Sequence, residues 1–137
     1  MSGNHIYGVD SYRQFRCLMV DTGDRVWEDL TLVPGGRWAT IHMVHNGDNV
    51  WMFNERGELI FTRLSPTGVE VISRAKLIEL TKGLLGMRQG MCWSHPAYAG
   101  KCIFARNDNE LVCASLAAPA AENSAENPLP TDPRKTH

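Results

Sequence analysis

Several features that would assign a function directly are missing from this 137-residue chain. No apolar run approaches the roughly 20 residues that a membrane-spanning helix needs, so no such helix is predicted. The 14 Lys and Arg residues are balanced by 15 Asp and Glu residues and form no basic stripe. Nucleic-acid binding therefore has no electrostatic basis. Residues 1–5 show neither the charged nor the apolar segment of a secretory signal.

Motifs of catalysis and metal binding are missing as well. No two of the four cysteines have Cys-x-x-Cys spacing, and there is no Gly-x-Ser-x-Gly, P-loop, His-Glu-x-x-His or dinucleotide-binding motif. Ser94 and His95 are adjacent, but no acidic partner can be identified for them. The sequence therefore predicts no catalytic residue, no cofactor, no cofactor-binding residue and no metal ligand, and it does not indicate an enzyme.

The chain does contain an internal repeat. Its three copies align without a gap, at spacings of 44 and 52 residues, over residues 6–21, 50–65 and 102–117. Equivalent positions in this alignment are Tyr7, Trp51 and Ile103, and then Phe15, Leu59 and Leu111. A period of roughly 40 to 50 residues is typical of stacked or radially arranged sheet units.

Each copy has the pattern of a β-hairpin, in which polar turn residues separate two apolar runs. The turns are expected near residues 11–13, 56–57 and 108–109. The middle copy has a further apolar segment on each side, so a complete unit of four antiparallel strands is predicted between residues 38 and 74. Residues 50–53 are apolar without alternation, which is typical of a strand buried on both faces. A helix is the alternative, but aromatic and β-branched residues between Gly, Asn and Asp favour a strand.

One segment of the first copy, residues 18–27, resembles a known repeat. Asp21, Thr22, Gly23 and Trp27 match the pyrroloquinoline-quinone-like (PQQ-like, quinoprotein-type) β-propeller repeat, whereas Met19 stands where that repeat usually has Asp. The resemblance implies that the Thr-Gly turn joins the third and fourth strands of a blade and that Trp27 docks on the neighbouring blade. The ending, residues 93–113, is similar to the closing blade of large extracytoplasmic propeller proteins of this superfamily.

The expected fold is therefore all-β, a partial β-propeller arc of about two and a half four-stranded antiparallel blades. Residues 1–117 form this region, with blade units near residues 1–33, 34–80 and 90–117, and residues 76–90 form a connection with at most one helical turn. A ring needs at least about four blades. We therefore expect the C-terminal fragment of a larger propeller protein; a natural short chain completed by a second copy or a partner subunit is the alternative. Pro, Ala, Glu and Asn dominate residues 118–137, which predicts a disordered tail.

The resemblance suggests two functions. The first is a non-catalytic propeller segment used for protein or polymer binding, as in the propeller lipoproteins of outer-membrane assembly. The alternative is part of a PQQ-dependent quinoprotein dehydrogenase or of another propeller enzyme. The first is favoured because catalysis needs convergent polar groups that the sequence does not supply. The expected partners are another protein or the missing blades. Self-association is expected, because the outer faces of the first and last units are uncovered and apolar, with Tyr7, Val9, Leu111 and Cys113 in their strands. The resemblance suggests an extracytoplasmic, periplasmic location for the parent protein.

The histidines leave a metal hypothesis open. His42 and His45 are three residues apart on a predicted strand, so their side chains should point to opposite faces, which argues against joint ligation. By the resemblance, His95 lies near the start of an inner strand and faces the central channel. A structural role is the alternative for all three.

The cysteines and tryptophans also have alternative roles. Cys102 and Cys113 are expected on adjacent strands of the last hairpin, as small packed residues, a disulfide or, less readily, a metal site; Cys17 and Cys92 are expected to pack. The four tryptophans are expected at strand positions, where they pack between blades or stack a cofactor; these are Trp27, Trp38, Trp51 and Trp93.

Overall fold

The computed structural model describes residues 3–10, 12–33, 37–81 and 90–118. Within these ranges the chain forms ten β-strands, and no helix there could cross a membrane. The all-β prediction is confirmed. Most of the predicted connection and almost all of the predicted disordered tail, residues 82–89 and 119–137, lie outside the described residues.

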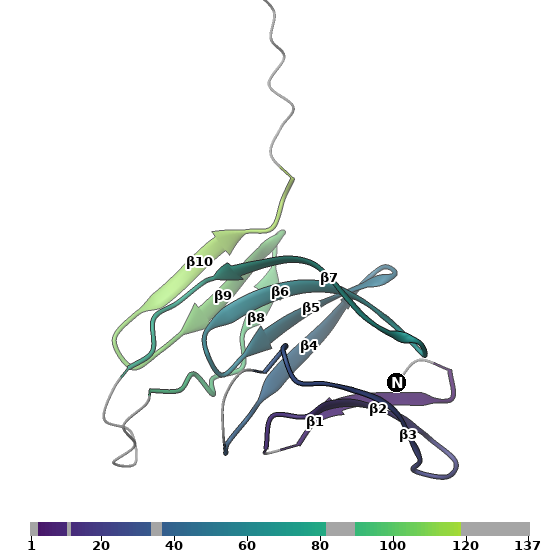
Figure 1. Cartoon of the computed structure of the whole chain (residues 1–137). Helices are drawn as coiled ribbons and strands as arrows, with labels where there is room; N and C mark the ends of the chain where they lie inside the picture. The colour runs from purple at the N-terminus through teal and green to yellow at the C-terminus, as the bar shows by residue number, and fades with distance from the viewer. Residues whose placement is uncertain (1–2, 11, 34–36, 82–89, 119–137) are drawn as a thin grey trace, which may run out of the picture.

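The strands form three antiparallel sheets that follow one another along the chain (Figure 1). The first sheet contains β1 (His5–Val9), β2 (Phe15–Met19) and β3 (Arg25–Asp29). The middle sheet contains β4 (Ile41–Asn46), β5 (Asn49–Asn54), β6 (Glu58–Ser65) and β7 (Gly68–Lys76). The last sheet contains β8 (Ala97–Ala99), β9 (Cys102–Arg106) and β10 (Leu111–Ser115). The predicted four-stranded unit between residues 38 and 74 thus corresponds to the middle sheet.

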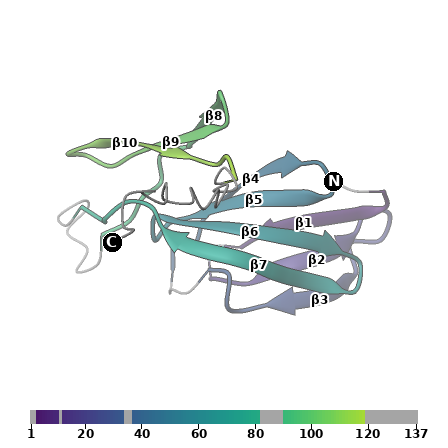
Figure 2. The same ribbon diagram turned by 90° about the horizontal axis from the view of Figure 1, so that it is seen from above.

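The middle sheet lies between the other two (Figure 2). Its side facing the first sheet contributes Val50, Met52 and Ile60 to one buried cluster. Its opposite side contributes Phe53 and Leu59 to a second cluster, shared with the last sheet. The predicted burial of residues 50–53 on both faces is confirmed, because alternate residues of β5 enter different clusters.

All three predicted hairpins are present, and each begins with a side chain that caps its turn. In the first, the Asp10 carboxylate accepts hydrogen bonds from the Tyr12 and Gln14 amides, at 2.9 and 3.2 Å. Asn54 and Asn107 accept equivalent bonds at the starts of the other two turns. Ser11, one of the predicted turn residues, lies outside the described residues.

The two asparagines also bind each hairpin to the chain that enters its sheet. The Asn54 side-chain amide donates to the Leu32 carbonyl at 3.1 Å, and that of Asn107 donates to the Glu79 carbonyl at 2.9 Å. Both carbonyls lie in the segment that arrives from the preceding sheet. These bonds therefore position successive sheets against one another.

The gapless alignment of the third copy is wrong by one residue in its first strand. The strand pairing shows this: four residues separate the paired Arg106 and Leu111, whereas five separate the equivalent pairs in the other hairpins. The first strand of the last hairpin is consequently 53 residues from its equivalent in the middle sheet, so Ile103 corresponds to Val50. Leu111 remains the equivalent of Phe15 and Leu59. Those two are buried against the following sheet, whereas Leu111 is 69% exposed on the outer face of the last sheet.

The docking role predicted for Trp27 is confirmed. Its ring packs at 5.9 Å from the rings of both Tyr7 and Phe15, and its indole nitrogen donates to the Ser65 carbonyl of β6 at 3.1 Å. The preceding turn joins β2 to β3: Thr22 accepts a bond from the Asp24 amide, and Gly23 has a φ of 74°, which favours glycine.

Candidate interaction sites

The segments that enter β4 and β8 bring aromatic and histidine side chains together. The rings of Trp38 and Trp93 meet edge to face at 6.2 Å, and the Trp93 indole nitrogen donates to the Trp38 carbonyl at 3.4 Å. The Arg37 guanidinium lies 4.8 Å from the Trp38 ring centroid, within the range of a cation–π contact. Trp38 and Trp93 precede their strands, so the prediction that they lie at strand positions is wrong for these two.

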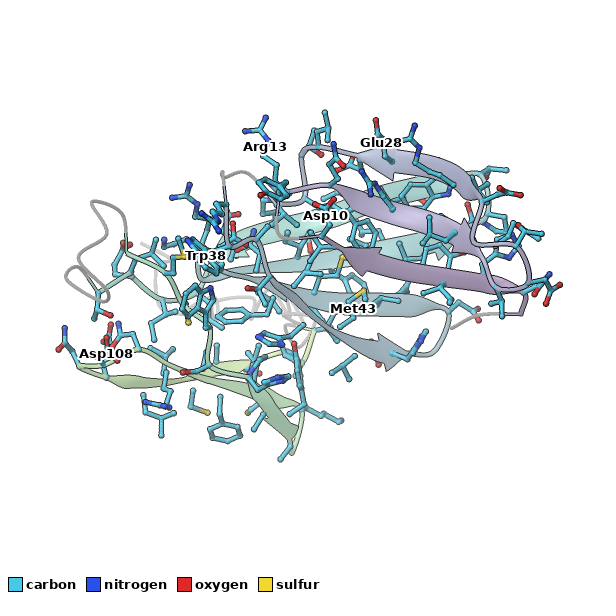
Figure 3. All side chains as sticks on the ribbon, turned by 90° about the horizontal axis from the view of Figure 1, so that it is seen from below. Asp10, Arg13, Glu28, Trp38, Met43 and Asp108 are labelled. Atoms are coloured by element: carbon cyan, nitrogen blue, oxygen red, sulfur yellow. The ribbon has the colours of Figure 1, made fainter. Side chains whose placement is uncertain are left out.

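Trp38 has an unusual backbone conformation for a bulky residue. Its φ is 79°, in the left-handed region that such residues rarely adopt. The ring is nevertheless 42% exposed and is labelled in Figure 3 between the middle and last sheets. Strained backbone conformations cluster at functional sites, so Trp38 is a candidate contact residue.

His42 and His95 form a pair of tilted rings in close contact beside these tryptophans. Their ring centroids are 3.8 Å apart with an interplanar angle of 46°. His42 lies on β4, and His95 lies two residues before β8, near the start of the strand as expected. Burial lowers the pKa of His42, the charge of His95 lowers it further, and a hydrogen bond to the Trp93 backbone opposes both effects. The pair is therefore more stable when His42 is neutral.

Metal binding finds little support in this geometry. His42 contacts His95, whereas His45 lines a groove on the other side of β4, together with Tyr7 and Met43. The two side chains thus point to opposite faces of the strand. Among the described residues, no group of three or more His, Cys, Asp or Glu side chains could hold a metal ion.

The groove lies between the first and middle sheets and has a volume of about 570 Å³. Its apolar lining comes from four side chains, Tyr7, Met43, Val50 and Leu64. Polar groups are supplied by His45, Asp48 and Arg63. In Figure 3, Met43 lies on β4, the edge strand of the middle sheet, beside β1. A groove with this lining and an adjacent strand edge can accept an extended apolar segment.

The cysteines divide into two groups. Cys17 and Cys92 are buried, as expected of small packed residues, and burial raises the pKa of both thiols. Cys102 and Cys113 are free thiols on the outer face of the last sheet, where Cys113 is exposed. Desolvation and a hydrogen bond with Cys102 raise the pKa of Cys113. Cys113 therefore lies on an uncovered face, as expected for its strand, and the alternative of a packed position is wrong for it.

The histidine pair was not predicted from the sequence, although a signal for it exists. Asn54 and Asn107 begin equivalent turns and are 53 residues apart, and so are His42 and His95. The gapless spacing of 52 residues hides this equivalence. With the corrected spacing, the two histidines occupy the same position of adjacent units.

Comparison with known proteins adds no relative to these observations. No protein-family model matches the chain, and no curated protein matches it.

Proposed function

We propose that the chain is a non-catalytic, protein-binding segment of a PQQ-like β-propeller, in which its three sheets are consecutive blades. Two features support the architecture. The hairpins of all three sheets share one register once the shorter last turn is allowed for. The Thr22-Gly23 turn also joins β2 to β3, and Trp27 contacts the following sheet, as the resemblance implies for this repeat.

The observation that carries the binding function is the outer face of the last sheet. Phe104 pairs with Cys113 on this face, as Trp51 pairs with Phe61 on the covered face of the middle sheet. Leu111 occupies the position of Leu59, yet it is 69% exposed. The last sheet thus presents apolar residues at the positions through which the middle sheet binds its neighbour. A further sheet, from the rest of a larger protein or from a partner, fits this face.

The outer face of the first sheet differs from the expectation. Tyr7 and Val9 were expected on an uncovered face, but both pack on the core shared with the middle sheet. The centre of the outer face holds Arg16, which is ion-paired with Asp10 at 3.3 Å and with Glu28 at 3.8 Å. Apolar association through this face is therefore weaker, and the proposed contact lies on the last sheet.

The oligomeric state tests this proposal. We expect the purified chain to elute as a dimer or larger species in size-exclusion chromatography with light scattering, since an exposed apolar face promotes association. Leu111→Glu should convert it to a monomer. Val71→Glu is the matched control, because Val71 is also exposed, at 43%, but lies on β7 of the middle sheet. A wild-type chain that is a stable monomer and unfolds cooperatively would contradict the proposal.

A further inference from the structure

We propose that the free edge of β1, together with the groove beside it, binds an extended apolar segment of a partner protein as the fourth strand of the first sheet. This inference rests on the proposed protein-binding function and names the site and the chemistry of the segment. It concerns a surface different from the outer face of the last sheet. The two can therefore fail separately.

The middle sheet shows what a completed edge looks like. Its β5 corresponds to β1, and β4 pairs along the whole of its edge: Val44 lies opposite Trp51, and His42 lies opposite Phe53. Among the described residues, no strand occupies this place in the first sheet, whose order is β1-β2-β3. Trp51 and Phe53 correspond to Tyr7 and Val9, so a segment that pairs with these two residues would repeat the geometry of β4.

The backbone of β1 offers hydrogen bonds to such a segment. The Asn4 carbonyl accepts from the Val20 amide at 3.0 Å, and the Asp10 amide donates to the Gln14 carbonyl at 3.2 Å. Peptide groups in an antiparallel pair point alternately toward and away from the partner strand. Because residues 4 and 10 face β2, the peptide groups of His5, Tyr7 and Val9 point to the open edge. An unpaired edge of this kind is a template for strand addition.

The groove determines the side chains that the segment would place there. Met43 is 37% exposed and lies with His45 on the face of β4 directed toward the first sheet. Side chains of an added strand alternate between faces, so every second residue would enter the groove between Tyr7 and these two side chains. Met43, Val50 and Leu64 favour apolar residues at those positions. The other alternate residues would face solvent and can be polar.

A peptide titration tests the site. The probe is a fluorescent nine-residue peptide of alternating Val and Thr with a lysine at each end, and its anisotropy is followed as the full chain is added. We expect saturable binding that Met43→Glu weakens by about tenfold or more. Val44→Glu is the matched control: Val44 is 39% exposed and adjacent on β4, but it points to the opposite face. Its effect should stay within about twofold.

Backbone pairing is tested separately from apolar adsorption. N-methylation of the peptide amides that face β1 should abolish binding, whereas methylation of the alternate amides should leave it intact, since only one set can pair with the edge. Hydrogen exchange at the His5, Tyr7 and Val9 amides should slow in the complex.

The inference would be overturned by equal effects of both methylated peptides, by equal effects of Met43→Glu and Val44→Glu, or by no binding. Protection of these three amides that rises with the concentration of the chain alone would also overturn it, since the occupant would then be a second copy. If Leu111→Glu still abolishes association in any of these cases, the proposed function stands without this site.

Discussion

The two interfaces that hold the three sheets together are built from different residues. Between the first and middle sheets lies an apolar cluster around Phe15 and Met52, and Trp27 closes it with an indole hydrogen bond to Ser65. Between the middle and last sheets, the cluster around Phe53 is flanked by the His42–His95 pair. At both interfaces an asparagine side-chain amide, of Asn54 or Asn107, positions the hairpin. In the part of the chain that the structure describes, two buried side-chain atoms at the second interface lack a hydrogen-bond partner, His42 Nε2 and the Tyr98 hydroxyl.

The two interfaces should therefore respond to different changes. An apolar interface closed by a tryptophan responds mainly to loss of volume. An interface that buries titratable groups responds to pH and to exact hydrogen bonding as well. We therefore expect the first interface to dominate stability and the second to be the one that conditions or a bound partner can alter.

The largest effect is expected for Trp27→Ala. It removes a large ring that contacts Tyr7 and Phe15 and also the bond to Ser65, so the free energy of unfolding should fall by about 3 to 5 kcal/mol. Urea denaturation measures this loss. Trp38→Ala is the control at the second interface, where the ring is 42% exposed, and its cost should be smaller. Equal losses of unfolding free energy in the two variants would contradict the expectation that the first interface dominates stability.

The next largest loss in the free energy of unfolding is expected for the asparagine variants, and it should differ between the two interfaces. Asn54 is fully buried, and Asn54→Ala leaves the Leu32 carbonyl and two turn amides without their bonds, so it should cost about 2 to 3 kcal/mol. Asn107 makes the equivalent bonds in a more exposed turn, and Asn107→Ala should cost about 1 kcal/mol. Chemical denaturation of both variants measures the difference. The reverse order would show that the two turns do not position their sheets in the same way.

These turns also show how much of the molecule follows from the sequence. The three hairpins and the four-stranded middle unit are local patterns that were predicted from residue order, whereas the docking of Trp27 was implied by the resemblance to the PQQ-like repeat. The single-residue deletion in the last turn was missed because the identical Glu-Leu pairs at 58–59 and 110–111 favour a gapless alignment of the second strands. That error hid the equivalence of His42 and His95.

The groove could not be predicted from the sequence for a different reason. It depends on where the first sheet ends relative to β4, which is a property of how two sheets stack. Tyr7 and Met43 are 36 residues apart and belong to different units, and no local pattern relates them. The same holds for Trp38, whose positive φ is imposed by its tertiary surroundings and runs against its own preference.

The pH dependence of stability distinguishes the two interfaces further. His42 has a pKa below its usual 6.5 in the folded chain, so the unfolded state binds more protons near that pH. The contribution of His42 to stability is therefore fully present above about pH 6.5 and is lost as the pH falls below that value.

The test compares the free energy of unfolding of the wild type with that of His42→Phe from pH 8 to pH 5. The wild type should lose stability relative to the variant on acidification. Glu55, whose pKa is raised by burial, titrates in both proteins and cancels in this comparison. A constant difference across the range would exclude the role assigned to His42.

The smallest effect is expected for Tyr98→Phe, and its sign is the informative part. Tyr98 packs on the cluster between the middle and last sheets, and its buried hydroxyl has no hydrogen-bond partner among the described residues. Burial raises the pKa of Tyr98 to about 12, so the group stays neutral. Removing an unpaired buried hydroxyl while keeping the ring should be neutral or raise the free energy of unfolding by up to about 1 kcal/mol. Tyr7→Phe is the control at the first interface, where the hydroxyl interacts with Cys17, and it should be neutral or slightly destabilising. A loss of more than about 1 kcal/mol in Tyr98→Phe would show that the hydroxyl is bonded, and that the second interface is as fully satisfied as the first.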